Sequence, residues 1–146
     1  LVKRGAIAKE AVSMQSIRSW LRVNKTDAQA VMQLNPSYIF FRPLQGPGPV
    51  GAQGVVLTPG RSLAVDRRFI PLGAPIWLAT TSPLDSSEAL NRLVIAQDTG
   101  SAIKGPVRGD LYWGHGENAA LNAGFMKSSG RYYILLPKPP RPAKAR

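Results

Sequence analysis

The sequence contains no cysteine and a single histidine, His115, among its 146 residues. Without cysteine the chain can form neither a disulfide nor a thiolate metal site, and it has no thiol to accept a lipid; the redox compartment is left undetermined. A single histidine excludes a metal site built from several imidazoles. The chemistry of any site must therefore come from other side chains.

Long apolar runs are also missing. No stretch approaches the roughly eighteen apolar residues that a membrane-spanning helix needs, and no signal-peptide pattern is present. The sequence begins at Leu1 and not at a methionine, so we expect it to be a fragment of a longer protein. With 44% apolar residues, a chain of 146 residues suffices for one domain with a real core, and no second domain fits comfortably.

Acidic residues are scarce, with 8 Asp and Glu against 19 Lys and Arg, which gives a formal net charge of +11. Part of this charge lies in residues 137–146, where Lys and Arg alternate with proline; we expect a disordered basic tail there. The remaining basic residues are scattered, without aromatic alternation. This pattern favours solubility or general attraction to an anionic polymer over nucleic-acid recognition.

The first part of the chain is predicted to be helical. Ser13 is a suitable N-cap for a helix in which Met14, Ile17, Trp20 and Leu21 share one face. A second helix is predicted from Thr26 or Asp27 to about Leu34, because the residue before Pro36 is disfavoured in the α region. We expect residues 1–37 to form a helical adaptor.

From residue 38 to 136 the pattern changes to short apolar or β-branched runs separated by glycine and proline. Surface loops are expected at residues 45–54 and 82–88, and a short helix at 117–123. The pattern predicts a mainly β fold with a few helices, as a small barrel or sandwich. The predicted strands cover residues 38–41, 55–57, 62–65, 76–79, 93–96 and 132–136.

Three of the few acidic residues, Asp66, Asp98 and Asp110, lie in loops next to apolar runs, where each is expected to follow a buried strand. A strand end can hold a carboxylate rigidly while leaving it open to a cleft, so these residues predict one acidic site. Local sequence also permits plainer interpretations. Asp110 follows a glycine and suits a turn, and Asp66 suits a turn in which it pairs with the adjacent arginines.

The residues around these aspartates resemble the three-aspartate, or 3D, domain, and the upstream segments resemble the C-terminal half of the membrane-bound lytic murein transglycosylase A family. This resemblance extends from about Ser13 to Leu136. It implies a double-psi β-barrel of the kind found in barwin and endoglucanase V, incomplete without an N-terminal part that the chain lacks. The motifs that carry it are residues 13–20, 35–42 and 64–73, Asp98-Thr99-Gly100-Ser101-Ala102-Ile103-Lys104-Gly105, and Asp110-x-Tyr112-x-Gly114.

The resemblance also implies an activity, the cleavage of the β-1,4 bond between MurNAc and GlcNAc in peptidoglycan with formation of 1,6-anhydro-MurNAc. Asp110 matches the family's catalytic aspartate, which acts first as acid and then as base, with Asp98 and Asp66 as supporting groups. No cofactor is required. Substrate-binding candidates are Lys104, Gly105, Tyr112 and Trp113; the two aromatic residues point to opposite sides if they lie in a strand.

The expected partners are peptidoglycan glycan strands and the missing N-terminal part and second domain of the parent protein. The parent is expected in the periplasm of a Gram-negative bacterium, held to the outer membrane by a lipid anchor outside this chain. No nucleic-acid partner is expected.

Three other functions have some support in the sequence. Asp98-Thr99-Gly100 resembles the motif of aspartic proteases, which would require a homodimer because only one copy is present. The run from Gly114 to Ala119 resembles a dinucleotide fingerprint, but no βαβ pattern surrounds it, which excludes that interpretation. The third alternative is a peptidoglycan-binding module without catalysis.

Overall fold

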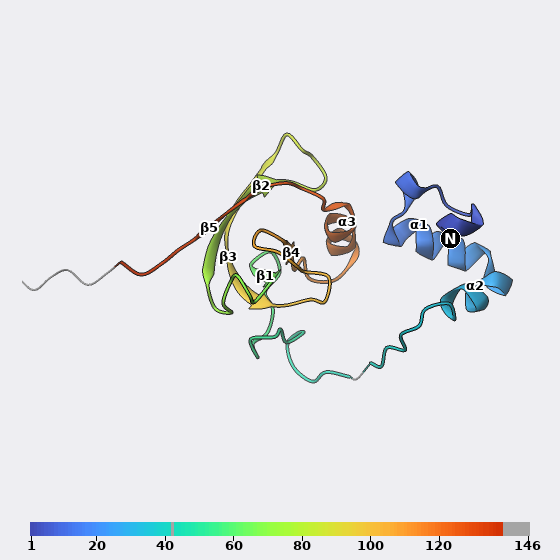
Figure 1. The fold of residues 1–146 in the computed structure, drawn as a ribbon, viewed down its shortest axis with the longest axis horizontal. Coiled ribbons are helices and arrows are strands. Elements are labelled where there is room, and N and C mark those ends of the chain that lie inside the picture. Colours follow the sequence, from blue (N-terminus) through green and yellow to red (C-terminus); the bar gives the residue numbers. More distant parts are fainter. Residues whose placement is uncertain (42, 139–146) are drawn as a thin grey trace, which may run out of the picture. The chain divides into compact units, whose positions relative to one another are not determined.

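The computed structural model describes residues 1–41 and 43–138 and divides the chain into two compact units, Leu1–Leu44 and Gln45–Arg146 (Figure 1). The division falls after residue 44 and not between residues 37 and 38, where the helical adaptor was predicted to end. Most of the predicted tail, residues 139–146, lies outside the described residues.

The first unit consists of short helices. Helix α1, Met14–Val23, begins at Ser13 as predicted: the Ser13 hydroxyl accepts a hydrogen bond from the Ser16 N–H at 3.0 Å, and the Ser13 N–H donates to Ser16 Oγ at 2.9 Å. This reciprocal capping satisfies two otherwise unpaired backbone donors. Helix α2, Lys25–Met32, follows directly and buries Ala28. Two single 3₁₀ turns, Val2–Arg4 and Lys9–Ala11, precede them.

Two predicted strands are wrong. Residues 38–41 form no strand, and Phe40 and Phe41 are 85% and 94% exposed. A strand needs a hydrogen-bonded neighbour, and no described segment supplies one for these residues. Residues 55–57 likewise form no strand and contribute only an isolated antiparallel bridge between Val50 and Val56. Residue composition favoured strands in both segments but did not reveal whether a pairing partner exists.

The second unit is built on one five-stranded sheet in the order β4-β1-β3-β2-β5. Strands β1 and β3 are parallel, and the other neighbours are antiparallel. Figure 1 shows the sheet strongly curved, with α3, Glu117–Phe125, in the same unit. The prediction of a mainly β fold with a few helices is confirmed. The strands are β1 Ser62–Val65, β2 Pro75–Thr81, β3 Ala89–Asp98, β4 Gly109–Leu111 and β5 Arg131–Ile134.

One face of this sheet makes the hydrophobic core. Burial alternates along β2 and from Leu63 to Val65 in β1, as expected for strands with one buried face. Ile76 and Val94 are completely buried, and Leu63 and Val65 retain 1% exposure. The core fixes which residues of β1 and β4 face away from it, and these residues include Ala64 and Asp110.

Candidate active site

Strand register brings two of the three aspartates to one place. Ala64 in β1 pairs with Asp98 at the end of β3 on one side and with Asp110 in β4 on the other. Residues directly opposite each other on neighbouring strands point to the same face. Two strand spacings separate Asp98 from Asp110, so their Cα atoms lie about 10 Å apart. The small side chain of Ala64 between them leaves the space open.

An irregularity in β1 makes this register possible. Ser62 pairs with Ile95 and Leu63 with Ala96, but the register then shifts and Ala64 pairs with Asp98 and not with Gln97. A bulge of this kind re-aims side chains. Gln97 consequently also stays near this face, where its Oε1 accepts a hydrogen bond of 2.6 Å from the buried Ser62 hydroxyl.

The two aspartates line an open cleft of about 390 Å³. Its floor comes from β1, through Ser62 and Ala64, and one wall comes from the loop that follows β3. Tyr112, which follows β4, supplies an aromatic side chain to the same cleft. The complete lining is Leu57, Ser62, Ala64, Asp98, Thr99, Gly100, Ser101, Ala102, Ile103, Asp110, Leu111 and Tyr112.

Asp110 is the most accessible of the three carboxylates. Its side chain is 55% exposed, and Arg108 Nη2 lies 3.0 Å from its Oδ1. Asp98 is half-buried, and its Oδ1 accepts a hydrogen bond of 3.0 Å from the Ala52 N–H, which attaches the loop before β1 to the end of β3. Each of these two carboxylates therefore keeps one oxygen without a partner among the described residues.

Asp66 is in a different position. It is only 5% exposed, and both of its oxygens accept hydrogen bonds. Arg68 donates through Nη2 at 2.6 Å, through Nε at 3.0 Å and through its backbone N–H at 3.1 Å, and the Gly105 N–H donates at 2.8 Å. The Arg68 guanidinium and then the Gly105 N–H hold the pKa of Asp66 well below its ordinary value. Asp66 is therefore ionised at neutral pH and joins the turn after β1 to the loop before β4.

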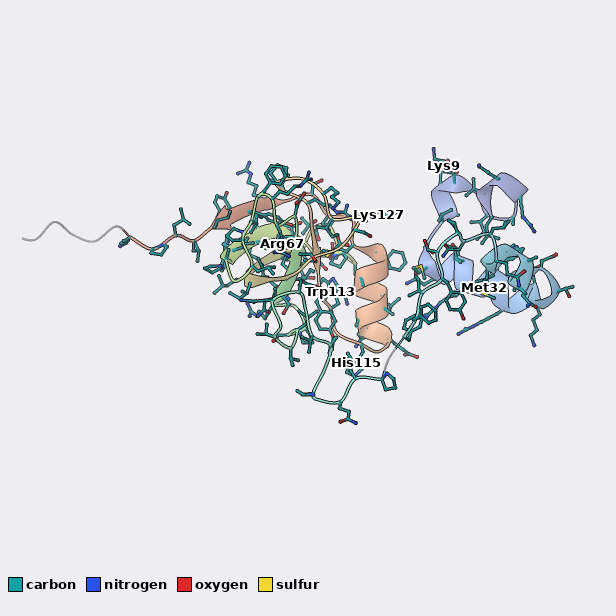
Figure 2. All side chains as sticks on the ribbon, turned by 60° about the horizontal axis from the view of Figure 1, so that its bottom comes forward. Lys9, Met32, Arg67, Trp113, His115 and Lys127 are labelled. Carbon is teal, nitrogen blue, oxygen red and sulfur yellow. The ribbon has the colours of Figure 1, made fainter. Side chains whose placement is uncertain are left out.

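The other predicted residues separate into two groups. Tyr112 lines the cleft, whereas Trp113 lies on the other side of β4, where its indole N–H donates to Met126 Sδ at 3.3 Å and its ring contacts the core. Figure 2 shows Trp113 beside α3, with His115 and Lys127 at opposite ends of that helix. Lys104 is exposed outside the residues that line the cleft, and Gly105 uses its N–H to bind Asp66.

Three contributing residues were not predicted. Ser62 lies on the floor of the cleft and is hydrogen-bonded to Gln97, although serine and glutamine within apolar runs gave no distinctive signal. Arg108 contacts Asp110; its position two residues before that aspartate was the available signal, because alternate residues of an extended chain share a face.

A larger cavity of about 570 Å³ lies on the core side of β4 and also reaches Asp110. Core residues such as Leu63 and Leu78 line its inner end, and Arg108 and Lys127 line it as well. Tyr132 of β5 also lines this cavity. Burial, and secondly the charge of Asp110, raises the pKa of Tyr132 above its ordinary value, so the phenol stays protonated at neutral pH.

The part of the chain that the structure describes contains no cluster of three or more metal-binding His, Cys, Asp or Glu side chains. None of the helices within residues 1–41 and 43–138 has both the length and the apolar character needed to cross a membrane.

The sequence and the fold match a known family. Residues 61–136 match the model of the 3D domain, and residues 1–42 match the model of the MltA specific insert domain. The first of these matches covers more than half of the chain. The chain belongs to the 3D-domain family, and the predicted similarity to membrane-bound lytic murein transglycosylase A is confirmed.

Individual relatives agree with this assignment. Membrane-bound lytic murein transglycosylase A of Escherichia coli strain K12 is 38% identical over 146 residues, covering 95% of this chain and 39% of that protein. The crystal structure of MltA from Neisseria gonorrhoeae, monoclinic form, aligns with a TM-score of 0.85 and 45% identity over 99% of this chain and 37% of that one. The crystal structure of E. coli MltA with bound chitohexaose aligns with a TM-score of 0.84 and 34% identity over 95% and 43% of the two chains. The chain thus spans about two-fifths of the length of these relatives.

Proposed function

We propose that this chain carries the catalytic site of a peptidoglycan lytic transglycosylase, which cleaves the β-1,4 bond between MurNAc and GlcNAc and forms 1,6-anhydro-MurNAc ends. One observation carries the proposal: Asp110 presents an accessible carboxyl to a cleft, opposite a second aspartate, in a chain of the 3D-domain family. The bound chitohexaose in the E. coli relative supports a glycan as the occupant of such a cleft.

Asp110 is proposed to act twice. In the first step the Asp110 Oδ2–H bond breaks and the proton moves to the glycosidic oxygen, which leaves C1 with the bonding electron pair. In the second step the 6-hydroxyl oxygen of the same MurNAc bonds to C1, and its proton returns to the Asp110 carboxylate. Since the substrate supplies its own nucleophile, neither water nor a second carboxylate nucleophile is consumed.

Asp98 and Asp66 are proposed to support this reaction without transferring protons. Asp98 holds the loop around Ala52 at the edge of the cleft and leaves its second oxygen for a substrate hydroxyl. Asp66 fixes the loop before β4 through Gly105. Tyr112 is the aromatic residue placed to pack against a sugar face in the cleft. Trp113, which faces the core, is proposed to stabilise β4. Lys104 is proposed to contact glycan at the outer rim of the cleft.

The fold is proposed to be the larger part of a double-psi β-barrel. Both edge strands, β4 and β5, lack a further neighbour among the described strands, and the larger cavity opens onto core residues. Residues of the parent protein outside this chain are proposed to pair with these edges and fill the cavity. The parent is proposed to lie in the periplasm, attached to the outer membrane through a lipid on a part outside this cysteine-free chain.

The test is the chemistry of the products. Purified sacculi are digested with the full-length protein that contains this chain, and the released muropeptides are analysed by mass spectrometry. Anhydro-MurNAc ends are expected from the wild type and should be absent with Asp110→Asn. Reducing ends from the wild type would contradict the transglycosylase assignment, and anhydro products from the variant would contradict the role of Asp110. Binding to sacculi without release of any fragment would favour the binding-module alternative.

A further inference from the structure

The guanidinium of Arg108 makes the contact that orients the proposed acid. Arg108 Nη2 lies 3.0 Å from Asp110 Oδ1, and no other side chain of residues 1–41 or 43–138 binds the Asp110 carboxyl. Oδ2 is therefore the oxygen left for a substrate. Asp66, by comparison, accepts five hydrogen bonds, and both of its oxygens have partners.

Arg108 contacts Asp110 but does not line the cleft. Arg108 lines the larger cavity on the core side of β4 and not the cleft, whereas Asp110 lines both. A guanidinium in this position constrains one carboxyl oxygen without obstructing the space in which a sugar would lie. Oδ1 is thus bound by a side chain that lies outside the lining of the cleft.

The backbone between the two residues is held from the core side. Tyr132 Oη lies where a side chain at Gly109 would begin, so Gly109 must lack a Cβ for the two strands to approach this closely. Arg108 and Asp110 flank Gly109, and residues two apart in an extended chain share a face. Arg108 and Asp110 are therefore kept adjacent by the fold.

The pair is poorly suited to a purely structural role. Its two side chains are 56% and 55% exposed, and ion pairs of that exposure contribute little to folding stability. A cation beside a group that becomes charged during a reaction, in contrast, stabilises the charged stage without having to move. In the proposed reaction Asp110 carries that charge between its two proton transfers.

We propose that Arg108 is a positioning residue for Asp110: it holds Oδ1 so that Oδ2 faces the cleft, and it balances the carboxylate charge until the second proton returns. This inference rests on the proposed transglycosylase function.

The test compares steady-state kinetics of the full-length protein and its variants on soluble, uncross-linked peptidoglycan strands. Arg108→Ala is expected to lower kcat by about 10- to 100-fold while KM stays within about twofold, because orientation and not binding is lost. Arg108→Lys, which keeps the charge, is expected to recover most of kcat. The thermal unfolding midpoint should not change in either variant. Arg67→Ala is the matched control, since it removes an exposed arginine outside both cavities.

Three results would overturn the inference. An Arg108→Ala variant with the wild-type kcat would show that orientation does not depend on Arg108. A raised KM at unchanged kcat would make Arg108 a substrate contact. Failure of Arg108→Lys to recover activity would show that charge is not the relevant property. If the wild type itself produces no anhydro-MurNAc, the proposed function fails first; if only the Arg108 expectations fail, the proposed function stands.

Discussion

The turn that follows β1 and the strand β4 each place an aspartate two residues from an arginine, in opposite order along the chain: Asp66 with Arg68, and Arg108 with Asp110. In the turn, the arginine binds through its side chain and backbone, a distant N–H adds another hydrogen bond, and the carboxylate is buried. In the strand, a single contact reaches an exposed carboxyl. Both aspartates have a neighbouring arginine, so the neighbouring charge does not distinguish them. The number of hydrogen-bond donors around each carboxylate does: the aspartate with many donors is structural, and the one with a single donor is free to react.

Of the substitutions that test the difference between the turn after β1 and strand β4, Asp110→Asn is expected to have the largest effect on activity. The amide cannot donate or accept the required proton, so activity on sacculi should fall by about 1000-fold or more. The unfolding midpoint should not change, because the exposed ion pair with Arg108 contributes little to stability. Product release measured by mass spectrometry together with thermal unfolding checks both statements. A strongly destabilised Asp110→Asn variant would show that Asp110 is structural, as Asp66 is, and would contradict the difference between the two aspartates.

A second expected effect concerns the space between the two cleft aspartates. Ala64→Val adds two methyl groups on the cleft face, where Ala64 lies between Asp98 and Asp110. We expect about a tenfold or greater loss of kcat/KM with little loss of stability, because valine suits strands and this position faces away from the core. Ala64→Ser is the control, with a much smaller increase in volume. Wild-type activity in the valine variant would show that substrate does not occupy this space.

A third effect tests how β4 is held. In Gly109→Ala the new methyl group would collide with Tyr132 Oη, and overpacking of this kind costs about 1–3 kcal/mol. Removing that hydroxyl in Gly109→Ala/Tyr132→Phe should recover part of the loss, which a double-mutant cycle by denaturant unfolding would measure. Strictly additive effects of the two substitutions would indicate that this contact does not constrain β4.

The smallest effect is expected from the turn. Asp66→Asn should lower the unfolding midpoint at neutral pH by roughly 5 °C, because the amide pairs less well with Arg68 and Gly105. Activity at low temperature should be largely retained. Comparable loss of activity in Asp66→Asn and Asp110→Asn would abolish the distinction between the two regions.

The stability of Asp66→Asn is expected to depend less on pH than that of the wild type. The folded-state pKa of Asp66 is depressed, so its contribution to stability is complete above the unfolded-state value of about 3.9 and is lost as pH falls below that value toward the folded pKa. The wild type should therefore lose more stability than Asp66→Asn between about pH 4 and pH 2. Parallel midpoint curves for the two proteins over this range would contradict the assignment.

Several elements were predictable because their causes are local. The Ser13 cap and the apolar spacing that follows it depend on residues within one or two helical turns, and α1 begins where they indicate. The strand at residues 62–65 was predicted with its observed bounds. The aspartates could be selected because each follows or lies in an apolar run, but their different surroundings depend on residues far away in the chain, such as Gly105 for Asp66 and Ala52 for Asp98.

Strand β4 could not be predicted from local sequence. It has three residues, two of which are Gly109 and Asp110, and neither favours a strand. It exists because β1 offers it backbone partners on its open edge. The segment 38–41 is the counterpart: its residues favour a strand, but no neighbour pairs with it in the described chain. Whether each segment forms a strand depends on backbone pairing with a neighbour, which a single sequence does not reveal.

The sequence by itself determined the class of fold, the start of α1 and the identity of three aspartates at the ends of apolar runs, because these follow from local periodicity, capping and motif. Only the tertiary structure decided that Asp98 and Asp110 lie on either side of Ala64 while Asp66 is bound elsewhere. That arrangement depends on the shift in register between β1 and β3, strands separated by more than twenty residues. Register is set by packing of the buried face and by the bulge, both of which are properties of the assembled sheet.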